Sequence, residues 1–335
     1  MGGGDHTPPT TPPDLTPAAD FLRDHEKFVI ASHRGPDGDA IGSLLALAAV
    51  LESLGKTVVR HGCDSVPYPF LFLEGAERIT VSLPATDDFC VVLVDCAEPS
   101  RAGQRLARFA EGRPLLVVDH HLVGAVTTAT LLSDPSAASV GLLVERLAER
   151  LGVPLSLGMA EAIYTTVISD TGSFHYSNTT PDALRCAARM VERGVDPWRV
   201  ASHLYEAEPL ARVKLLGEVL ATLEISPDGL CATLLVTQKM LQRYGAGEDL
   251  LDGFINYGRR VQGVEIAVLI REIRPDLHKC SLRSRGRVNV AGVASRFGGG
   301  GHHNAAGCQL SGDYLTVRRT IVEAVRQELA SCTAC

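Results

Sequence analysis

The sequence predicts an α/β protein with two domains: a parallel-sheet N-terminal domain with flanking helices, and a smaller, mixed α/β C-terminal domain. Its 335 residues correspond to two domains of roughly 150 residues each. The first half repeats a short β-branched run, a polar turn and a helical pattern, which is typical of a parallel sheet. A strong turn signal, Ser226-Pro-Asp-Gly229, then separates this half from a second set of strands.

The elements of the first half are predicted from its apolar runs. Strands are expected at 28–33, 56–60, 89–95 and 115–119. The last two runs lack internal polar residues, as strands buried on both faces of a parallel sheet do. Helices are expected at 40–54, 137–151 and 160–169. The first helix is apolar nearly all round and should be buried, and Gly55 ends it.

The second half begins with a helix and continues with strands. Leucine and valine recur at helical spacing from Pro209 to Leu223. Strands are expected at 230–237, 264–272 and 279–284, a helix start at the small residues 304–307, and a closing helix at 314–331. We therefore divide the chain into a flexible tail (1–17), a first domain (18–208), a linker helix (209–226) and a second domain (227–331).

Composition and charge exclude several classes of protein. A hydrophobic fraction of 45% with 21% charged residues is ordinary for a globular chain and excludes intrinsic disorder. No apolar stretch reaches the 18 or more residues that cross a bilayer, so no membrane span is expected. The net charge of −7 argues against gripping long nucleic acid through many phosphates, whereas a short anionic substrate stays open.

The cysteines and the N-terminus indicate a cytoplasmic protein. Nine cysteines are scattered, mostly in apolar runs, and an odd number fits a reducing compartment. Residues 1–17 are rich in glycine and proline and lack the pattern of a secretory signal. The terminal Cys332-Thr-Ala-Cys335 has no second pair of ligands nearby, so neither a zinc site nor a redox role is expected for it.

The residues that end the apolar runs carry the chemistry. The runs terminate in His33, in Asp95, in Asp119-His120-His121 and in Asp170. In an open α/β sheet, ligands bind just beyond the carboxyl ends of the strands. Four separate segments are therefore expected to deliver acids and imidazoles to one crevice.

The crowding of carboxylates in this crevice predicts metal ions. The acids are Asp37, Asp39, Asp95, Asp119 and Asp170. Together they would repel one another unless cations were present. Mixed His and Asp ligands without cysteine suit Mn²⁺, Co²⁺ or Mg²⁺, and their number exceeds what one ion needs. We expect two ions, although each piece alone would be read as a turn, a helix cap or a surface pair.

A glycine run in the second half is the other chemical signal. Gly298 to Gly301 precede His302 and the small residues 304–307. Such a run can be a hinge, but its backbone N–H groups can also bind an anion. The upstream Ser281-Leu-Arg283-Ser284 could add a guanidinium for a phosphate, unless it is only a solvated strand face. We favour anion binding.

These motifs, in this order, resemble those of the DHH phosphoesterase superfamily with its DHH-associated C-terminal domain. The matching segments are 32–43, Asp95, 119–121, 170–172 and 298–307, so that the resemblance covers about residues 20 to 330. The contexts of Asn256-Tyr257 and of Ser281 to Ser284 resemble the branch of nanoRNases and pAp phosphatases, the bifunctional oligoribonuclease and PAP phosphatases. That branch also includes cyclic dinucleotide phosphodiesterases.

The resemblance implies a role for each motif residue. One Mn²⁺ would be held by His33, Asp37 and Asp95, and the other by Asp39, Asp95, His120 and Asp170. Asp95 would bridge the ions, Asp119 would orient His120, and His121 would face the scissile phosphate. The active site would lie in the cleft between the domains.

The second domain is implied to bind the rest of the substrate. Its binding residues would be Arg283, Ser284, Gly299, Gly300, Gly301 and His302. The sequence departs from the family at Gly124, where an Asn is common. A homodimer also occurs often in this branch.

The expected enzyme hydrolyses short oligonucleotides to 5′-mononucleotides and pAp to AMP, with Mn²⁺ and with Mg²⁺ or Co²⁺ as alternatives. A cyclic dinucleotide phosphodiesterase is the first alternative, and the motifs barely separate it. A pyrophosphatase or polyphosphatase would need several lysines near the cleft, where only Lys239 and Lys279 are available. A non-catalytic metal- and nucleotide-binding regulator is disfavoured because no expected ligand is substituted.

Overall fold

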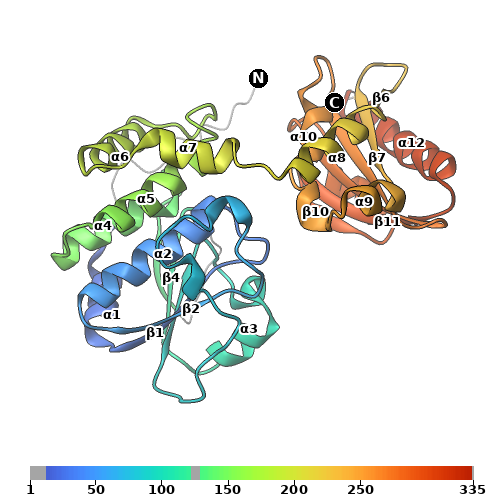
Figure 1. Cartoon of the computed structure of the whole chain (residues 1–335). Coiled ribbons are helices and arrows are strands. Elements are labelled where there is room, and N and C mark those ends of the chain that lie inside the picture. Colours follow the sequence, from blue (N-terminus) through green and yellow to red (C-terminus); the bar gives the residue numbers. More distant parts are fainter. Residues whose placement is uncertain (1–12, 122–128, 334–335) are drawn as a thin grey trace. The chain divides into compact units, whose positions relative to one another are not determined.

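The computed structural model describes residues 13–121 and 129–333, and it divides into two compact units between Ala207 and Glu208 (Figure 1). Each unit has its own sheet and its own hydrophobic core. The expected fold class is therefore confirmed: the first unit holds a parallel sheet with flanking helices, and the second a smaller mixed α/β arrangement.

The sheet of unit 1 is entirely parallel, with the order β2-β1-β3-β4-β5 among the described residues. Its strands are β1 (Lys27–Ala31), β2 (Thr57–His61), β3 (Cys90–Val94), β4 (Leu115–Asp119) and β5 (Thr130–Ser133). The four expected strands are present within two residues of the expected ends. The edge strand β5 was not expected, because its four residues are only partly apolar and follow no long run.

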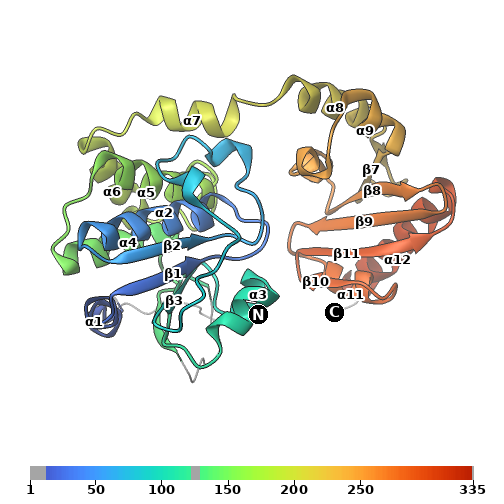
Figure 2. The same cartoon turned by 60° about the horizontal axis from the view of Figure 1, so that its bottom comes forward.

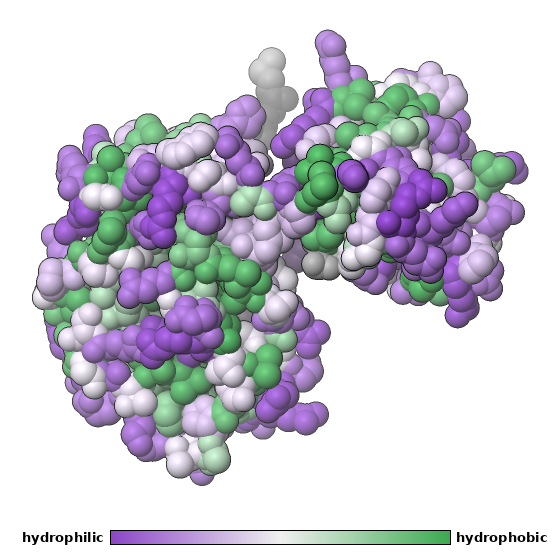
Figure 3. Space-filling model, viewed as in Figure 1, coloured by the Kyte–Doolittle hydropathy of each residue, from purple (hydrophilic) through white to green (hydrophobic). Residues whose placement is uncertain are grey.

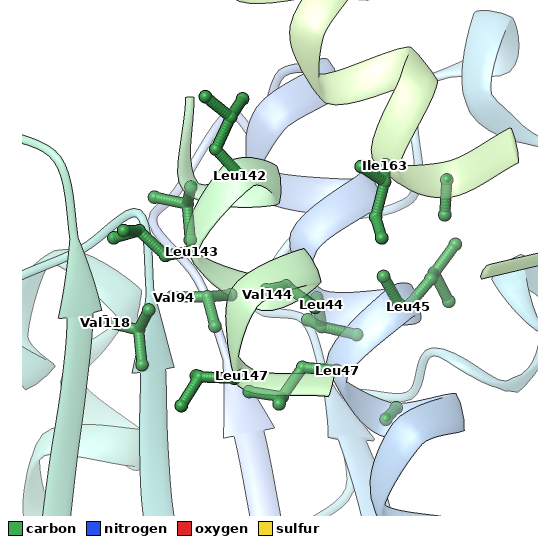
Figure 4. Packing of buried hydrophobic residues seen from close by; sticks show 14 of the residues in the cluster. Leu44, Leu45, Leu47, Val94, Val118, Leu142, Leu143, Val144, Leu147 and Ile163 are labelled. Carbon is green, nitrogen blue, oxygen red and sulfur yellow. The ribbon is translucent and has the colours of Figure 1, made fainter. Parts of the chain in front are cut away.

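Helices cover both faces of this sheet. They are α1 (Thr16–Asp24), α2 (Gly38–Ser53), α3 (Gln104–Ala110), α4 (Val140–Leu151), α5 (Leu157–Asp170), α6 (Pro181–Glu192) and α7 (Pro197–Tyr205), with short 3₁₀ helices η1 (Tyr68–Phe70), η2 (Ala76–Arg78) and η3 (Pro99–Ala102). Phe28 and Ile30 of β1 face the core shared with α2, α4 and α5, whereas Val29 and Ala31 face α3. Figure 4 shows leucines of α2 and α4 packed around Val94 and Val118.

The helix α2 is the centre of the larger core. It is buried nearly all round, as its apolar sequence predicts. It also approaches α5 very closely, because a Cβ added at Gly42 would lie 2.6 Å from the Ala162 carbonyl oxygen. This close packing brings the start of α2 and the end of α5 to the same edge of the sheet.

Unit 2 has a mixed sheet with the order β10-β11-β9-β8-β7-β6 (Figure 2). Its strands are β6 (Glu224–Ile225), β7 (Cys231–Val236), β8 (Ile266–Arg274), β9 (Leu277–Ser284), β10 (Gly300–His302) and β11 (Ala305–Ser311). Its helices are α8 (Leu210–Leu220), α9 (Gln238–Tyr244), η4 (Glu248–Leu251), α10 (Phe254–Arg260), α11 (Val290–Ser295) and α12 (Tyr314–Thr333). Among the described strands of unit 2, only β7 and β8 pair in parallel, and the other pairs are antiparallel.

Two cores lie on opposite faces of this second sheet. The helices α11 and α12 pack on one face, and α8, α9 and α10 pack on the other. The α8 helix, expected as a linker, buries Leu215 and Val219 against β7 and β8 and so is part of unit 2. Lys279 and Gln309 of β9 and β11 are exposed, and Arg283 is partly exposed.

Two expectations need correction in the structure. The small residues 304–307, expected to begin a helix, lead into strand β11. Glycine and alanine permit the close pairing of β11 with β10. This pairing with another segment, and not the small size of the residues, decides that they form a strand. The helix α1 begins at Thr16, so the last two residues of the expected flexible tail are helical.

The surface gives no sign of a membrane-spanning element. Among the described helices, none combines the length and the hydropathy needed to cross a bilayer. Figure 3 shows hydrophilic residues spread over the visible face of each unit, with hydrophobic residues between them in small groups.

Candidate metal centre

Eight acid and imidazole side chains gather at the carboxyl edge of the unit 1 sheet. They are His33, Asp37, Asp39, Asp95, Asp119, His120, His121 and Asp170. Strands β1, β3 and β4 deliver five of them, the start of α2 delivers two, and the end of α5 delivers Asp170. The convergence expected from the sequence therefore exists in the fold.

The ligand atoms form adjoining groups in which all atoms lie within 4.8 Å of one another. One group is His33, Asp37 and Asp95, and another is Asp39, His120 and Asp170. His33 Nε2 lies 3.3 Å from Asp95 Oδ2, and His120 Nε2 lies 3.6 Å from Asp95 Oδ1 and 3.4 Å from Asp170 Oδ2. Asp95 thus stands between the two groups.

The two acids of the Asp37-Gly-Asp39 motif are held in different ways. Asp37 is the N-cap of α2, where its Oδ1 accepts the amides of Asp39 and Ala40 at 3.1 and 3.0 Å. Its other oxygen is not used by the cap, so the capping role and ligation are compatible. Asp39 is fully buried and accepts the Val140 amide and the Ser43 hydroxyl, both at 2.8 Å.

Asp95 has an unusual backbone conformation and an unsatisfied oxygen. Its φ is 54°, in the left-handed region that Asp and Asn tolerate better than most residues. Its Oδ1 is buried and has no hydrogen-bond partner, and the same holds for Asp119 Oδ2. Buried carboxylate oxygens without partners are costly. The residues present therefore fit divalent cations with oxygen and imidazole ligands.

The raised pKa values of the site also favour the binding of cations. Burial raises the pKa of Asp170 to about 6 and that of Asp39 well above its usual range, and neighbouring carboxylates add to both shifts. The hydrogen bond to Asp95 raises the pKa of His33 to about 8. Without cations, protons thus partly neutralise the cluster. Added positive charge would take the place of these protons.

Asp119 contacts a different histidine from the one that the resemblance implied. Its Oδ1 lies 2.8 Å from His121 Nδ1 and accepts the His121 amide at 3.0 Å. His120 is oriented instead by the Ala137 carbonyl oxygen, 3.1 Å from its Nδ1. The two consecutive rings lie 4.6 Å apart, centroid to centroid, and both approach Asp95, but only the His121 ring forms a hydrogen bond with Asp119.

In unit 2, Arg283 and His302 lie on one face of the sheet. Arg283 of β9 pairs with Ala305 of β11, and Ala305 pairs with His302 of β10. Directly paired residues share a face, so the two side chains are separated by the small Ala305. Arg283 also lines a pocket of about 250 Å³ together with Arg271 and Lys279.

Ser284 is placed away from that face. It is buried, and its hydroxyl donates to Asn304 Oδ1 at 3.0 Å. Its neighbour Arg283 points to the opposite side because side chains alternate along a strand. Ser284 thus holds the loop before β11, and its hydroxyl is already used.

The glycine run leads into the edge strand β10 and forms its first two residues, Gly300 and Gly301. A Cβ added at Gly299 would lie 2.2 Å from the Gly307 carbonyl oxygen, and one at Gly301 would lie 2.4 Å from the Ala305 oxygen. These two positions require glycine because β11 approaches so closely. Gly300 to His302 are exposed, so an anion could reach their backbone.

Several supporting residues were not identified from the sequence. Asn178 donates to the Asp170 carbonyl oxygen at 3.1 Å. Gly172, Ser173 and Phe174 then all have positive φ, between 56° and 65°. No local sequence pattern predicts such contacts. Gly124 and Cys335 lie outside the described residues, as does the side chain of Cys332.

A parallel α/β domain that gathers His and Asp side chains into groups able to hold metal ions is typical of metal-dependent hydrolases. Two family models match the chain: the DHH family, N-terminal domain, over residues 27–167, and the DHHA1 domain over residues 233–331. The bifunctional oligoribonuclease and PAP phosphatase NrnA of Thermus thermophilus is 35% identical over 90% of this chain and 89% of that protein. The chain therefore belongs to the DHH family and is a phosphoesterase, a hydrolase. This finding confirms the resemblance seen in the sequence.

Solved structures agree with this assignment. An exopolyphosphatase-related protein from Bacteroides fragilis superposes with a TM-score of 0.87 at 25% identity, covering 97% of this chain and all of that one. The exonuclease RecJ bound to manganese superposes with a TM-score of 0.55 at 17% identity, covering 94% and 96%. At this identity, the RecJ likeness supports the fold alone.

Proposed function

We propose that the protein is a Mn²⁺-dependent phosphoesterase that hydrolyses very short oligonucleotides to 5′-mononucleotides and pAp to AMP. The observation that carries this proposal is the pair of adjoining His and Asp groups, with Asp95 of one group 3.6 Å from His120 of the other. The name of the Thermus thermophilus relative supports the choice of substrates. Free thiols at the seven described cysteines whose side chains are placed suit a reducing compartment such as the cytoplasm.

The residues that would hold the ions follow the two groups. His33, Asp37 and Asp95 would hold one ion. Asp39, His120 and Asp170 would hold the other, with Asp95 shared between them. Two bound divalent ions supply Lewis acidity and charge neutralisation at the scissile phosphate. The Val140 amide and the Ala137 carbonyl orient Asp39 and His120 for this task.

His121 is the residue that we expect to protonate the leaving oxygen. The hydrogen bond to Asp119 raises the pKa of His121 and leaves its Nε2 directed away from that acid. Its side chain is 53% exposed, so a substrate can reach it. In the reaction, a water molecule gives one proton to the solvent as its oxygen bonds to phosphorus, and the bond from phosphorus to the 3′-oxygen breaks. Nε2 of His121 then gives its proton to that oxygen.

Unit 2 would bind the 5′-terminal phosphate, remote from the cut. Arg283, His302 and the backbone of Gly299 to Gly301 are the groups that we assign to it. Arg283 is available because, within the described residues, its guanidinium forms no salt bridge, and its recorded hydrogen bond is to the Leu282 carbonyl. Ser284 would act indirectly, by holding Asn304.

A substrate panel tests the proposed function. The substrates are pAp, pApA, a 24-mer, c-di-AMP and pyrophosphate, each with Mn²⁺, Mg²⁺ or Co²⁺ after treatment with a chelator. We expect Mn²⁺ to restore turnover of pAp and pApA. Faster hydrolysis of c-di-AMP would favour the cyclic dinucleotide alternative, and no turnover with any metal would contradict an enzymatic role.

The assignment of unit 2 has its own test. Arg283→Ala and His302→Ala should each lower kcat/KM for pAp at least about tenfold, because a charged hydrogen bond to phosphate is lost. Calorimetric Mn²⁺ titrations should stay unchanged, since unit 1 holds the ions. Arg274→Ala, at an exposed arginine paired with Asp276, is the matched control. Unchanged kcat/KM in both variants would reject a substrate role for this face.

A further inference from the structure

Three arginines stand beside the metal centre and have no part in the function proposed above. Arg34 directly follows the ligand residue His33, Arg101 lies in η3, and Arg105 lies in α3. The Arg34 amide donates to the Arg101 carbonyl oxygen at 2.9 Å. The loop after β1 and the segment after β3 are thus joined at this edge of the sheet.

The three guanidinium groups lie around the ends of β2, β1 and β3. A Cβ added at Gly103 would lie 3.9 Å from an Arg34 nitrogen, so Arg34 extends across the end of η3. Burial lowers the pKa of His61 at the end of β2, and the charge of Arg105 contributes to the shift. Arg101 lies in η3 (Pro99–Ala102), which begins five residues after the end of β3 at Val94.

These arginines are free to bind an anion. In the described ranges 13–121 and 129–333, none of the three forms a salt bridge, and all three are exposed. The neighbouring acid Asp64 already accepts the Gly35 amide at 2.8 Å and faces the Cys63 thiol at 3.7 Å. By contrast, Arg60 on β2 is buried and is held by both oxygens of Glu52.

The order of the strands places the three arginines to one side of the metal-ligand side chains. The sheet runs β2-β1-β3-β4. The metal-ligand side chains occupy the ends of β1, β3 and β4, and the arginines occupy the ends of β2, β1 and β3. A phosphodiester chain that leaves the metal centre toward β2 would therefore pass from the carboxylate cluster directly onto three positive charges.

We propose that Arg34, Arg101 and Arg105 form a subsite for the phosphate that follows the scissile one on its 3′ side. This inference rests on the proposed function, in which unit 2 takes the 5′-terminal phosphate. The trinucleotide pApApA carries a phosphate that can occupy the subsite, whereas pApA ends one phosphate too early. The subsite thus favours substrates of three nucleotides over those of two.

The test compares the first cleavage of pApApA and of pApA with Mn²⁺. In Arg101→Ala and Arg105→Ala, kcat/KM for pApApA should fall at least about tenfold, with less than a twofold change for pApA. Arg101→Lys should retain most of the activity on pApApA, because it keeps the charge. Arg185→Ala, at an exposed arginine of α6, is the control and should change neither substrate. Arg34 is left intact because it adjoins His33.

The outcomes distinguish a failure of the subsite from a failure of the proposed function. An equal loss on both substrates, or altered Mn²⁺ binding, would mean that the arginines support the fold of the metal centre, and it would overturn the subsite. No loss on either substrate would overturn it as well. If the wild-type protein cleaves neither substrate, the proposed function itself fails and the subsite fails with it.

Discussion

Asp95 combines an unusual backbone conformation, burial and a position beside both groups of candidate metal ligands. It follows β3 directly, adopts a φ of 54°, and is 98% buried at the boundary between the two ligand groups. A left-handed backbone costs most residues about 1 kcal/mol or more, and Asp and Asn least among side-chain-bearing residues. The left-handed backbone at Asp95 therefore costs some stability, and it directs one carboxylate toward both groups.

Asp95→Asn is the sharpest single substitution for the two-metal assignment. Asn keeps the size and tolerates the same φ, so the fold should persist, while one charged ligand oxygen is lost. We expect turnover of pApA to fall at least about a thousandfold and the midpoint of thermal unfolding without metal to stay the same or rise. Asp20→Asn on the exposed face of α1 is the control. A folded Asp95→Asn protein with a tenth of wild-type turnover would contradict the assignment.

The titration of His33 and Asp170 sets the pH dependence. Both pKa values are raised in the folded state, to about 8 and about 6. A raised pKa adds stability below the unfolded-state value, and this stability is lost as the pH rises through the folded-state value. The metal-free protein should therefore lose stability from about pH 4 to 6 through Asp170 and from about pH 6.5 to 8 through His33.

Bound metal should reverse this loss, because the ligands must be deprotonated to bind it. We expect saturating Mn²⁺ to raise the unfolding midpoint by about 5 °C more at pH 8 than at pH 5.5. Thermal melts with Mn²⁺ and with a chelator across this range measure the difference. His33→Gln should remove the part between pH 6.5 and 8. A metal effect that is constant with pH would contradict the raised pKa values.

At the scale of elements, the contact between α2 and α5 positions the metal centre. These helices carry Asp39 and Asp170, and they approach at Gly42 so closely that its Cβ would lie 2.6 Å from both the Ala162 oxygen and Thr166 Cγ2. Gly141 at the start of α4 contacts the same Thr166. The geometry of the ligands is thus set by helix packing as well as by strand ends.

Gly42→Ala should separate these two helices without changing a ligand. We expect about 1–3 kcal/mol of destabilisation from overpacking and a Mn²⁺ affinity that falls about tenfold, measured by denaturant unfolding and by calorimetry. Gly217→Ala in α8, where a Cβ would meet nothing within 4 Å, should gain roughly 0.5–1 kcal/mol instead and bind Mn²⁺ normally. Normal affinity in Gly42→Ala would show that α2 and α5 do not control the ligand geometry.

At the scale of the whole molecule, charge should limit the length of the substrate. The net charge is −7, and the arginines described above are confined to short clusters in each unit. Long single strands need an extended positive track. We expect kcat/KM for a 24-mer to be at least about tenfold below that for pApApA at equal concentrations of ends. Comparable values would indicate a processive exonuclease.

The sequence alone predicted which residues gather at the candidate metal centre. His33, Asp95 and His120 follow apolar runs that form strands, and the carboxyl ends of parallel strands meet at one edge of the sheet. Asp170 ends an apolar run that is a helix, and it reaches the same edge through the packing of α5 on α2. The burial of β3 on both faces likewise follows from its unbroken run of apolar residues. These features depend on neighbours in sequence, so they could be predicted without the fold.

The tertiary structure decided the contacts that join distant segments. Asp119 holds His121 and leaves His120 to the Ala137 carbonyl, Ser284 turns inward to Asn304, and 304–307 enters a strand. The Arg34 loop meets Arg101 only because β1 and β3 are neighbours in the sheet. Each of these contacts depends on strand order, register or the direction of one side chain. Because such choices are settled by packing between segments far apart in the chain, local sequence patterns cannot predict them.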